Sequence, residues 1–139
     1  MTLEQLIKNI KPVEVVGSAV TEVTGINIDS RKIEDGHVFV AMRGTQVDGH
    51  SFIGKAIELG AKTIVCEEKP AELADGVCYV VVKSSEEVVG EMATQFYGDP
   101  SRKLKLCGVT GTNGKTTIAT LLFNMFRQFG HKCGLLSTV

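Results

Sequence analysis

The sequence predicts an α/β fold made of a small mixed-sheet domain followed by the first β-α-β unit of a second α/β domain. Two observations lead to this prediction. Short apolar runs that are typical of strands alternate with stretches of helical periodicity along the whole chain. A segment that combines Gly, Pro and charged residues, 98–103, interrupts this alternation. We therefore expect one domain at 1–97, a linker at 98–103 and the truncated start of another domain at 104–139.

The elements of the first domain are predicted from apolar periodicity and from the residues at each end. Strands are expected where apolar residues run together or alternate, at 13–16, 25–30, 37–42, 62–66 and 77–82. A first helix is capped by Thr2, a second is capped by Ser51 and closed by Gly60, and a third begins at Ser84 or Ser85. This alternation of strands and helices favours a parallel or mixed sheet.

The second predicted domain begins with a buried strand at 104–109, a Gly-rich loop and a helix at 115–129, and ends with a strand at 132–139. Such a loop holds phosphate because glycines let the backbone come close, free N–H groups point at the oxygens and the helix dipole favours negative charge. Lys115 is expected to reach the β- and γ-phosphates of ATP, and the Thr116 hydroxyl to bind Mg²⁺. The predicted ATP-binding residues are Gly111, Thr112, Asn113, Gly114, Lys115, Thr116 and Thr117.

The loop departs from the strict phosphate-loop pattern Gly-x-x-x-x-Gly-Lys-Ser/Thr. Val109 stands at the position of the first Gly, and Gly108 lies one residue earlier. An alternative interpretation is a Gly-rich turn that only joins a strand to a helix. The order of strand, loop, Gly-Lys-Thr and helix favours nucleotide binding, and Lys115 is the predicted catalytic residue.

Composition and charge argue against several classes of protein. The net charge is −1 and charged residues are interspersed, so nothing favours binding to nucleic acid. No apolar run approaches the roughly 20 residues that span a bilayer, and no secretory signal is visible. The four cysteines lack Cys-x-x-Cys spacing, which favours buried reduced thiols over a zinc site or disulfides. We therefore expect a cytoplasmic protein without membrane insertion.

Several blocks of sequence, taken in order, carry a resemblance to a known family. Asp29-Ser30-Arg31 precedes a block at 36–41, and the block at 48–53 reads Asp-Gly-His-Ser-Phe-Ile. The segment 96–101, Phe-Tyr-Gly-Asp-Pro-Ser, then leads into the loop at 108–117, which is the most specific block. In these blocks, which cover nearly the whole chain, the sequence resembles the Mur ligases of the MurE type. These UDP-N-acetylmuramoyl-dipeptide ligases add the third amino acid of the peptidoglycan stem peptide.

This resemblance implies a first domain that recognises the UDP part of the substrate, a central ATPase domain and a last domain that selects the amino acid. The implied partners are UDP-MurNAc-L-Ala-D-Glu and an amino acid, meso-diaminopimelate or L-lysine, and the implied cofactors are ATP and Mg²⁺. Amide formation would proceed through an acyl phosphate. The family's contacts to the UDP substrate fall on Ile28, Ser30, Thr45, Gln46 and Val47.

The resemblance also bears on activity and assembly. The family's acidic magnesium ligand, carbamylated lysine and amino-acid-reading arginine motif fall beyond Val139. A polypeptide of these residues is therefore expected to be inactive. The full-length parent is expected to be a monomer, whereas the fragment is expected to self-associate through 104–139, which lacks the rest of its sheet.

Alternatives remain open at this stage. One is the related Mur ligase that adds D-Ala-D-Ala, and another is a UDP-sugar-binding module without catalysis. Asp29-Ser30 taken alone reads as a turn, and 45–47 as a plain surface loop. Arg31, Lys32 and Arg43 would neutralise a diphosphate or form a solvated basic face. His50 is expected to help start a turn or helix, not to act in catalysis.

Overall fold

The computed structural model describes residues 1–18, 21–44 and 47–137. The chain divides into two compact units, Met1–Pro100 and Ser101–Val139. None of the helices in the described residues is both long enough and apolar enough to cross a membrane.

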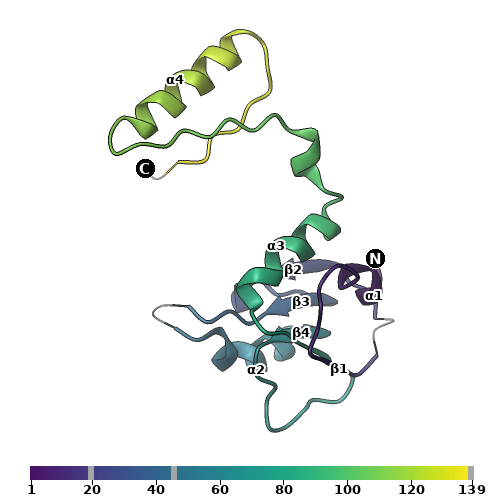
Figure 1. Ribbon diagram of the computed structural model, residues 1–139. Helices are drawn as coiled ribbons and strands as arrows, with labels where there is room; N and C mark the ends of the chain where they lie inside the picture. Colours follow the sequence, from purple (N-terminus) through teal and green to yellow (C-terminus); the bar gives the residue numbers. More distant parts are fainter. Residues whose placement is uncertain (19–20, 45–46, 138–139) are drawn as a thin grey trace. The chain divides into compact units, whose positions relative to one another are not determined.

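A five-stranded sheet forms the centre of the first unit (Figure 1). In the order β1-β5-β4-β3-β2, the three pairs from β5 to β2 are parallel, whereas β1 lies antiparallel to β5 at one edge. The predicted mixed sheet is confirmed, and each of the five strands predicted for the first domain contains one observed strand. The strands are β1 (Glu14–Val16), β2 (Gly25–Asn27), β3 (His37–Val40), β4 (Thr63–Cys66) and β5 (Cys78–Val81).

Helices cover both faces of this sheet, because successive side chains of a strand point to opposite faces. On β3, Val38 and Val40 belong to the apolar cluster that includes α1 (Leu3–Leu6) and Met92 of α3 (Ser85–Phe96). Phe39 belongs to the other cluster, with Ile53 and Ala56 of α2 (Ile53–Glu58). The first unit is therefore a three-layer α/β/α domain whose central strands are buried on both faces.

The helix ends agree in part with the predicted caps. The Thr2 side chain accepts the N–H of Gln5 in a capping box, and the Ser84 hydroxyl accepts the N–H of Glu87 at the start of α3. The predicted cap at Ser51 is wrong. Asp48 stands earlier in the chain, and its carboxylate starts the 3₁₀-helix η2 (Gly49–Phe52), which runs into α2. The Ser51 hydroxyl instead donates to the Asp48 carbonyl, at 2.6 Å.

The second unit contains the predicted helix but not its predicted strands. The helix α4 spans Lys115–Gln128, and a 3₁₀-helix, η3 (Pro100–Lys103), lies at the boundary of the two units. The segments 105–110 and 131–137 have no regular secondary structure, and residues 138 and 139 lie outside the described part. A strand forms only against a neighbouring strand, and the sheet of the first unit ends at β1 and β2. The strand prediction for 104–109 and 132–139 is therefore wrong for the described residues.

Candidate functional site

The parallel strands bring four segments to one edge of the sheet. Because β2, β3, β4 and β5 run parallel, their carboxyl ends lie at the same edge. The segment 28–32 follows β2, the segment 41–50 follows β3, Glu67 and Glu68 follow β4, and the start of α3 follows β5. In open α/β sheets, this is the edge at which ligands bind.

Ser30 lies at this edge, at the start of the 3₁₀-helix η1 (Ser30–Lys32). Its residue surface is 7% exposed, and its hydroxyl has no hydrogen-bond partner among the described residues. A nearly buried hydroxyl with unused donor and acceptor capacity is suited to bind a ligand. Ile28, two residues earlier, is 58% exposed.

Asp29 fixes the turn that carries Ser30. Its carboxylate accepts the backbone N–H of Arg31 at 3.0 Å and the Arg31 guanidinium through two contacts, at 2.9 and 2.8 Å. These side-chain and backbone hydrogen bonds from Arg31 lower the pKa of Asp29 to about 2. Arg31 is therefore neutralised by its neighbour, which weighs against the idea that it balances a diphosphate.

After β3, residues 43 and 44 pair with residues 47 and 48. Arg43 and Asp48 pair as an antiparallel bridge, and the N–H of Gly44 donates to the carbonyl of Val47 at 3.1 Å. Val47 is 56% exposed. The predicted substrate residues Thr45 and Gln46 lie outside the described residues. We call the paired residues 43, 44, 47 and 48 the hairpin below.

Arg43 anchors one side of the hairpin to the residues that follow β4. Its Nε lies 3.2 Å from a Glu67 carboxylate oxygen, and its Nη2 lies 2.6 Å from Glu68 Oε1. The other Glu67 oxygen accepts the N–H of Ser85 at 3.0 Å, so the same carboxylate also holds the start of α3. These contacts raise the pKa of Arg43, chiefly through its hydrogen bond to Glu68. Arg43 is thus a structural ion-pair partner.

His50 anchors the other side of the hairpin, whereas its sequence position predicts only that it helps to start a turn or helix. Its Nδ1 lies 2.7 Å from Asp48 Oδ1, and its Nε2 accepts the backbone N–H groups of Glu67 at 2.9 Å and Glu68 at 3.4 Å. Asp48 also accepts the N–H of His50, and these hydrogen bonds lower the pKa of Asp48. The Asp-Gly-His spacing predicts the turn, but it does not predict the contacts with Glu67 and Glu68, which lie 17 and 18 positions away.

The predicted ATP loop lies within the second unit. Gly111 and Gly114 have φ of +150° and +76°, conformations that residues with a Cβ rarely adopt. The Lys115 ammonium donates to the carbonyl oxygens of Gly111 at 2.6 Å and Thr112 at 3.4 Å, so the loop folds around this side chain. As in every α-helix, the first backbone N–H groups of α4 have no carbonyl acceptor within the helix. The donors that a triphosphate needs are therefore gathered in one loop.

Thr116 is the single residue predicted to bind magnesium. Its hydroxyl accepts a hydrogen bond from Ser137 at 3.4 Å, which a stronger ligand can displace. Mg²⁺ is commonly held by one or two carboxylates together with water and phosphate oxygens. The described residues contain no group of three or more His, Cys, Asp or Glu that would hold a metal ion by themselves. A single hydroxyl is a sparse ligand set, so any magnesium bound here would depend on phosphate oxygens of a nucleotide.

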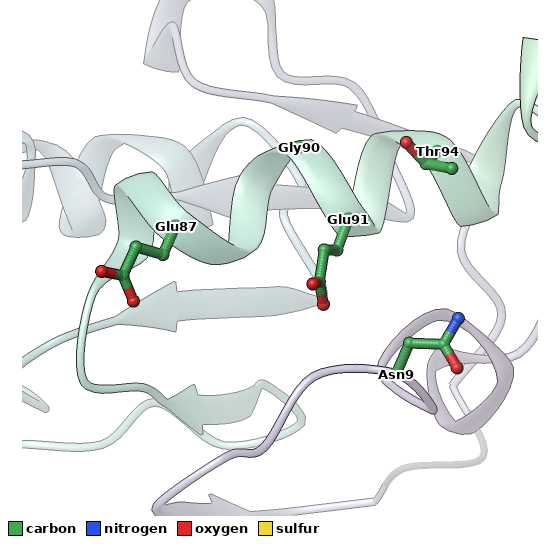
Figure 2. A pocket seen from close by; sticks show the side chains of 5 residues that line it. All are labelled: Asn9, Glu87, Gly90, Glu91 and Thr94. Carbon is green, nitrogen blue, oxygen red and sulfur yellow. The ribbon is translucent and has the colours of Figure 1, made fainter. Parts of the chain in front are cut away.

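A hollow lies on the first unit, between α3 and the segment after α1 (Figure 2). Figure 2 shows the Glu87 and Glu91 side chains on one side of α3 and Asn9 across from them. Asn9 is linked to this helix through a hydrogen bond to Gln95, at 3.2 Å. The hollow contains none of the predicted site residues, and its two carboxylates disfavour a phosphate.

Comparison with known proteins gives the family. A sequence profile described as "Mur ligase family, catalytic domain" matches residues 22–97. The chain is 62% identical over its full length to a protein of Phocaeicola vulgatus named UDP-N-acetylmuramoyl-L-alanyl-D-glutamate–2,6-diaminopimelate ligase, and 60% identical to the protein of the same name from Bacteroides fragilis. In both cases the chain spans 29% of the relative's length.

Solved structures agree with the fold. MurF ligase from Thermotoga maritima, in complex with ADP, is 32% identical and has a TM-score of 0.57, over 78% of this chain and 24% of that one. A structure titled as a UDP-N-acetylmuramoyl-L-alanyl-D-glutamate–2,6-diaminopimelate ligase has a TM-score of 0.65 at 24% identity, over the whole chain and 29% of that one. At that identity the likeness shows the fold alone. Together with the profile match over more than half of its residues, this places the chain in the Mur ligase family.

Proposed function

We propose that this chain is the first part of an ATP-dependent ligase that adds 2,6-diaminopimelate to UDP-MurNAc-L-Ala-D-Glu in peptidoglycan synthesis. The observation that carries the proposal is identity of 50–62% over the full chain to five proteins that bear the name of that ligase. The D-Ala-D-Ala-adding ligase is the rival within the family. Solved structures do not separate the two, because four structures of the D-Ala-D-Ala-adding type or named MurF are 23–32% identical to this chain and the solved diaminopimelate ligase is 24% identical. The five relatives of 50–62% identity carry the choice of diaminopimelate.

The proposed reaction divides into a phosphoryl transfer and an acyl transfer. The γ-phosphoryl group of ATP moves to the free carboxylate of the D-glutamate, which gives ADP and an acyl phosphate. The amine of the amino acid then attacks the carbonyl carbon, and the tetrahedral intermediate releases phosphate. This chain would contribute to the first step by electrostatics, because Lys115 and the loop amides offset charge on the β- and γ-phosphates. Thr116 would help to hold Mg²⁺, which would offset further negative charge on the phosphates.

The UDP part of the substrate is proposed to bind at the carboxyl edge of the sheet. The support is the unpartnered Ser30 hydroxyl together with the exposed Ile28 and Val47. Thr45 and Gln46 belong to the same proposed site by the family resemblance alone. A hydroxyl and backbone groups on a rigid sheet edge suit a uracil edge or a diphosphate oxygen.

Titration of the 139-residue chain with UDP, followed by calorimetry or NMR without ATP or Mg²⁺, tests this site. Binding is expected at millimolar or lower concentration. Ser30→Ala is expected to weaken it by about 1 kcal/mol, or roughly fivefold, the scale of one net hydrogen bond. Thr94→Ala, which removes a hydroxyl in the hollow of Figure 2, is the matched control and is expected to change nothing. Equal weakening by both variants, or no binding, would contradict the site.

A polypeptide of these 139 residues is expected to bind ligands without turnover, because it spans less than a third of the length of its relatives. Phosphate release that depends on UDP-MurNAc-dipeptide and diaminopimelate, above the level of Lys115→Ala, would refute this expectation. We also propose a cytoplasmic location, where the substrates of such a ligase are made. The four free cysteines are consistent with a reducing compartment. The parent ligase is proposed to act as a monomer.

A further inference from the structure

Two polar side chains that take no part in the proposed reaction tie the turn that carries Ser30 to the sheet. Asn27 is the last residue of β2 and His37 is the first residue of β3, and both are half-buried. We propose that Asn27 and His37 are positioning residues that hold this turn and thereby set the affinity of the carboxyl edge for a uridine diphosphate. The link to affinity rests on the proposed function, whereas the hold on the turn does not.

The pleat of the sheet places the two side chains on one face. Gly25 pairs with His37 in the parallel register of β2 and β3, and Asn27 lies two residues after Gly25. Residues paired in this way, and residues two apart on one strand, point to the same face. A Cβ on Gly25 would lie 2.4 Å from the Nε2 atom of His37, so the imidazole lies directly over this glycine. The missing side chain at position 25 therefore provides the space that the ring occupies.

The Asn27 carboxamide fixes the end of the turn. Its Nδ2 donates to the Lys32 carbonyl at 3.0 Å and lies 3.2 Å from the Nδ1 atom of His37. Because an amide nitrogen only donates, Nδ1 is the acceptor in the second contact. The backbone N–H of Glu34 also donates to Nδ1, at 3.2 Å. The imidazole thus orients the carboxamide, and the carboxamide holds the carbonyl of the last residue of η1.

Ser30 lies between this anchor and the one that Asp29 supplies. The Asp29 carboxylate accepts the N–H of Arg31 at 3.0 Å, and the Asp29 carbonyl accepts the N–H of Lys32 at 3.0 Å, so the start of η1 is fixed. Asn27 fixes the carbonyl at its other end. A hydroxyl that is only 7% exposed can reach a ligand in a narrow range of orientations, so a turn held at both ends is preorganised for binding.

Other contacts keep the connection between β2 and β3 folded when this anchor is removed. Ile33 is buried in the apolar cluster that includes α2, and the Thr24 hydroxyl donates to the Asp35 carbonyl at 2.9 Å. Removal of the Asn27 carboxamide should therefore loosen η1 without unfolding the sheet. Substitutions at this position can test the hold on the turn apart from the fold.

The experiment uses the 139-residue chain at a single pH, with two substitutions at His37 that separate the ring from its acceptor. His37→Phe keeps a ring over Gly25 and removes the acceptor. His37→Asn loses the ring but places a carboxamide oxygen close to the position of Nδ1. Asn27→Leu keeps the shape of the carboxamide without its N–H groups. Asn9→Leu is the matched control, because Asn9 is exposed and bonds to Gln95 on α3.

Two readouts separate the hold on the turn from its effect on binding. Hydrogen exchange without ligand, followed by NMR, reports on the backbone amides of Arg31, Lys32 and Glu34, with those of β4 and β5 for comparison. UDP affinity is measured by calorimetry for each variant and again in a Ser30→Ala background. The free energy of unfolding in urea is measured in parallel, because a residue that only stabilises the fold would change it and leave the affinity unchanged.

Asn27→Leu is expected to speed exchange at the amides of the turn and to weaken UDP binding about fivefold, the scale of one net hydrogen bond. His37→Phe should do the same, whereas His37→Asn should bind UDP within about twofold of the wild type. Added to Ser30→Ala, Asn27→Leu should weaken binding by less than about twofold further, because the turn then has no hydroxyl to position. Asn9→Leu should change neither readout.

Three results would overturn the proposal. If His37→Phe bound like the wild type and His37→Asn bound weakly, the role would belong to packing of the ring. If the effects of Asn27→Leu and Ser30→Ala on affinity were fully additive, Asn27 would not act through Ser30. If exchange in the turn ignored the loss of the carboxamide, the pair would not hold the turn.

Gly25→Ala replaces His37→Phe if that variant does not fold. Its methyl group displaces the ring, which can turn away, and it should also weaken UDP binding about fivefold. If the wild type binds no UDP, the proposed site and the claim on affinity fail together. Hydrogen exchange then still decides whether Asn27 and His37 hold the turn.

Discussion

At the scale of single residues, burial divides the four cysteines into two classes. Cys66 and Cys78 are buried in β4 and β5, whereas Cys107 and Cys133 are exposed in the second unit. Burial raises the pKa of the Cys66 thiol to about 11 and also raises that of Cys78. The spacing of the four cysteines predicted buried thiols, and the exposure of Cys107 and Cys133 corrects this for the second unit. Cys107 is exposed because its predicted strand is not formed.

Alkylation of the native chain at pH 8 is therefore expected to modify Cys107 and Cys133 and to spare Cys66 and Cys78, since the thiolate is the reactive form. Mass spectrometry after a timed iodoacetamide pulse gives the count. In guanidinium chloride all four should react, and Cys107→Ser with Cys133→Ser should leave the native chain unmodified. Fast reaction of Cys66 in the folded chain would contradict its burial.

The Asp29–Arg31 pair gives a second prediction at this scale. Because the folded pKa of Asp29 is about 2 and its ordinary value is 3.8, ionised Asp29 favours the folded state above pH 3.8. This contribution is lost as the pH falls from 3.8 towards 2. Asp29→Asn should remove it, and the effect should be small because the pair is exposed.

Urea unfolding of wild type and Asp29→Asn at pH 6 and pH 2.5 measures the difference. The gap in stability between the two proteins is expected to be smaller at pH 2.5 than at pH 6. Asp35→Asn is the control, because the Asp35 carboxylate makes a single long contact, to Lys62 at 3.7 Å. A gap that widens in acid would show that the sign is wrong.

The sequence predicted contacts between residues that are close together in the chain, but it did not predict contacts between segments that are far apart. Asp29-Ser30-Arg31 could be interpreted because each contact lies within two positions. The anchoring of Arg43 and His50 at Glu67 and Glu68 could not be foreseen, because it depends on the parallel pairing of β3 with β4. The residues predicted to bind UDP and ATP stay predictions.

At the scale of elements, Gly60 and Gly54 should respond in opposite ways to alanine. Gly60 ends α2 with φ +107°, and a Cβ there would lie 2.9 Å from the Asp35 Cα. Gly60→Ala is expected to destabilise the chain by about 1–3 kcal/mol. Gly54 lies inside α2 with open space around it, so Gly54→Ala should stabilise by about 0.5–1 kcal/mol.

Thermal or urea unfolding of the two variants beside the wild type provides the measurement. Both substitutions add one methyl group, one inside α2 and one at its end. The difference between their effects on the free energy of unfolding therefore reports on the surroundings and backbone conformation of each glycine, not on side-chain chemistry. If Gly60→Ala were neutral, Asp35 and the turn at 35–36 would have to move without cost. If Gly54→Ala were destabilising, the open space beside it would be in doubt.

The elements also show why strands were harder to predict than helices. The helix α4 forms from its own 14 residues, because its hydrogen bonds are local. The apolar run at 104–109 has strand composition, but a strand requires a partner that lies elsewhere in sequence. All five strands of the first unit were predicted, since each had partners within the same 100 residues.

At the scale of the whole molecule, the two units differ in what they bury. The first has two apolar clusters that cover both faces of its sheet. The second buries none of its described residues, and its apolar side chains remain exposed; they include Leu104, Leu106, Ile118, Leu121, Met125, Phe126 and Phe129. Burial of apolar surface is the main favourable term in folding, so the stability of the chain resides in the first unit.

This difference predicts that the 139-residue chain self-associates through its second unit. Exposed apolar side chains on one face of α4 and unpaired extended segments are complementary to themselves in a two-fold arrangement, because each copy presents the same groups. Sedimentation or light scattering should therefore show a concentration-dependent dimer or larger species. A version cut after Ser101 should remain monomeric, since the sheet of the first unit is covered on both faces.

Leu121→Glu combined with Met125→Glu offers a finer comparison, because it places charge on the exposed face of α4 and leaves the first unit untouched. This variant should behave like the shortened version, whereas Lys115→Ala, which removes the lysine of the same helix that we propose to bind phosphate, should still associate. Hydrogen exchange adds the structural readout, with protection of amides in 104–110 expected only at concentrations where the chain associates. A monomer at all concentrations with protected amides in this segment would show that the second unit completes its own core.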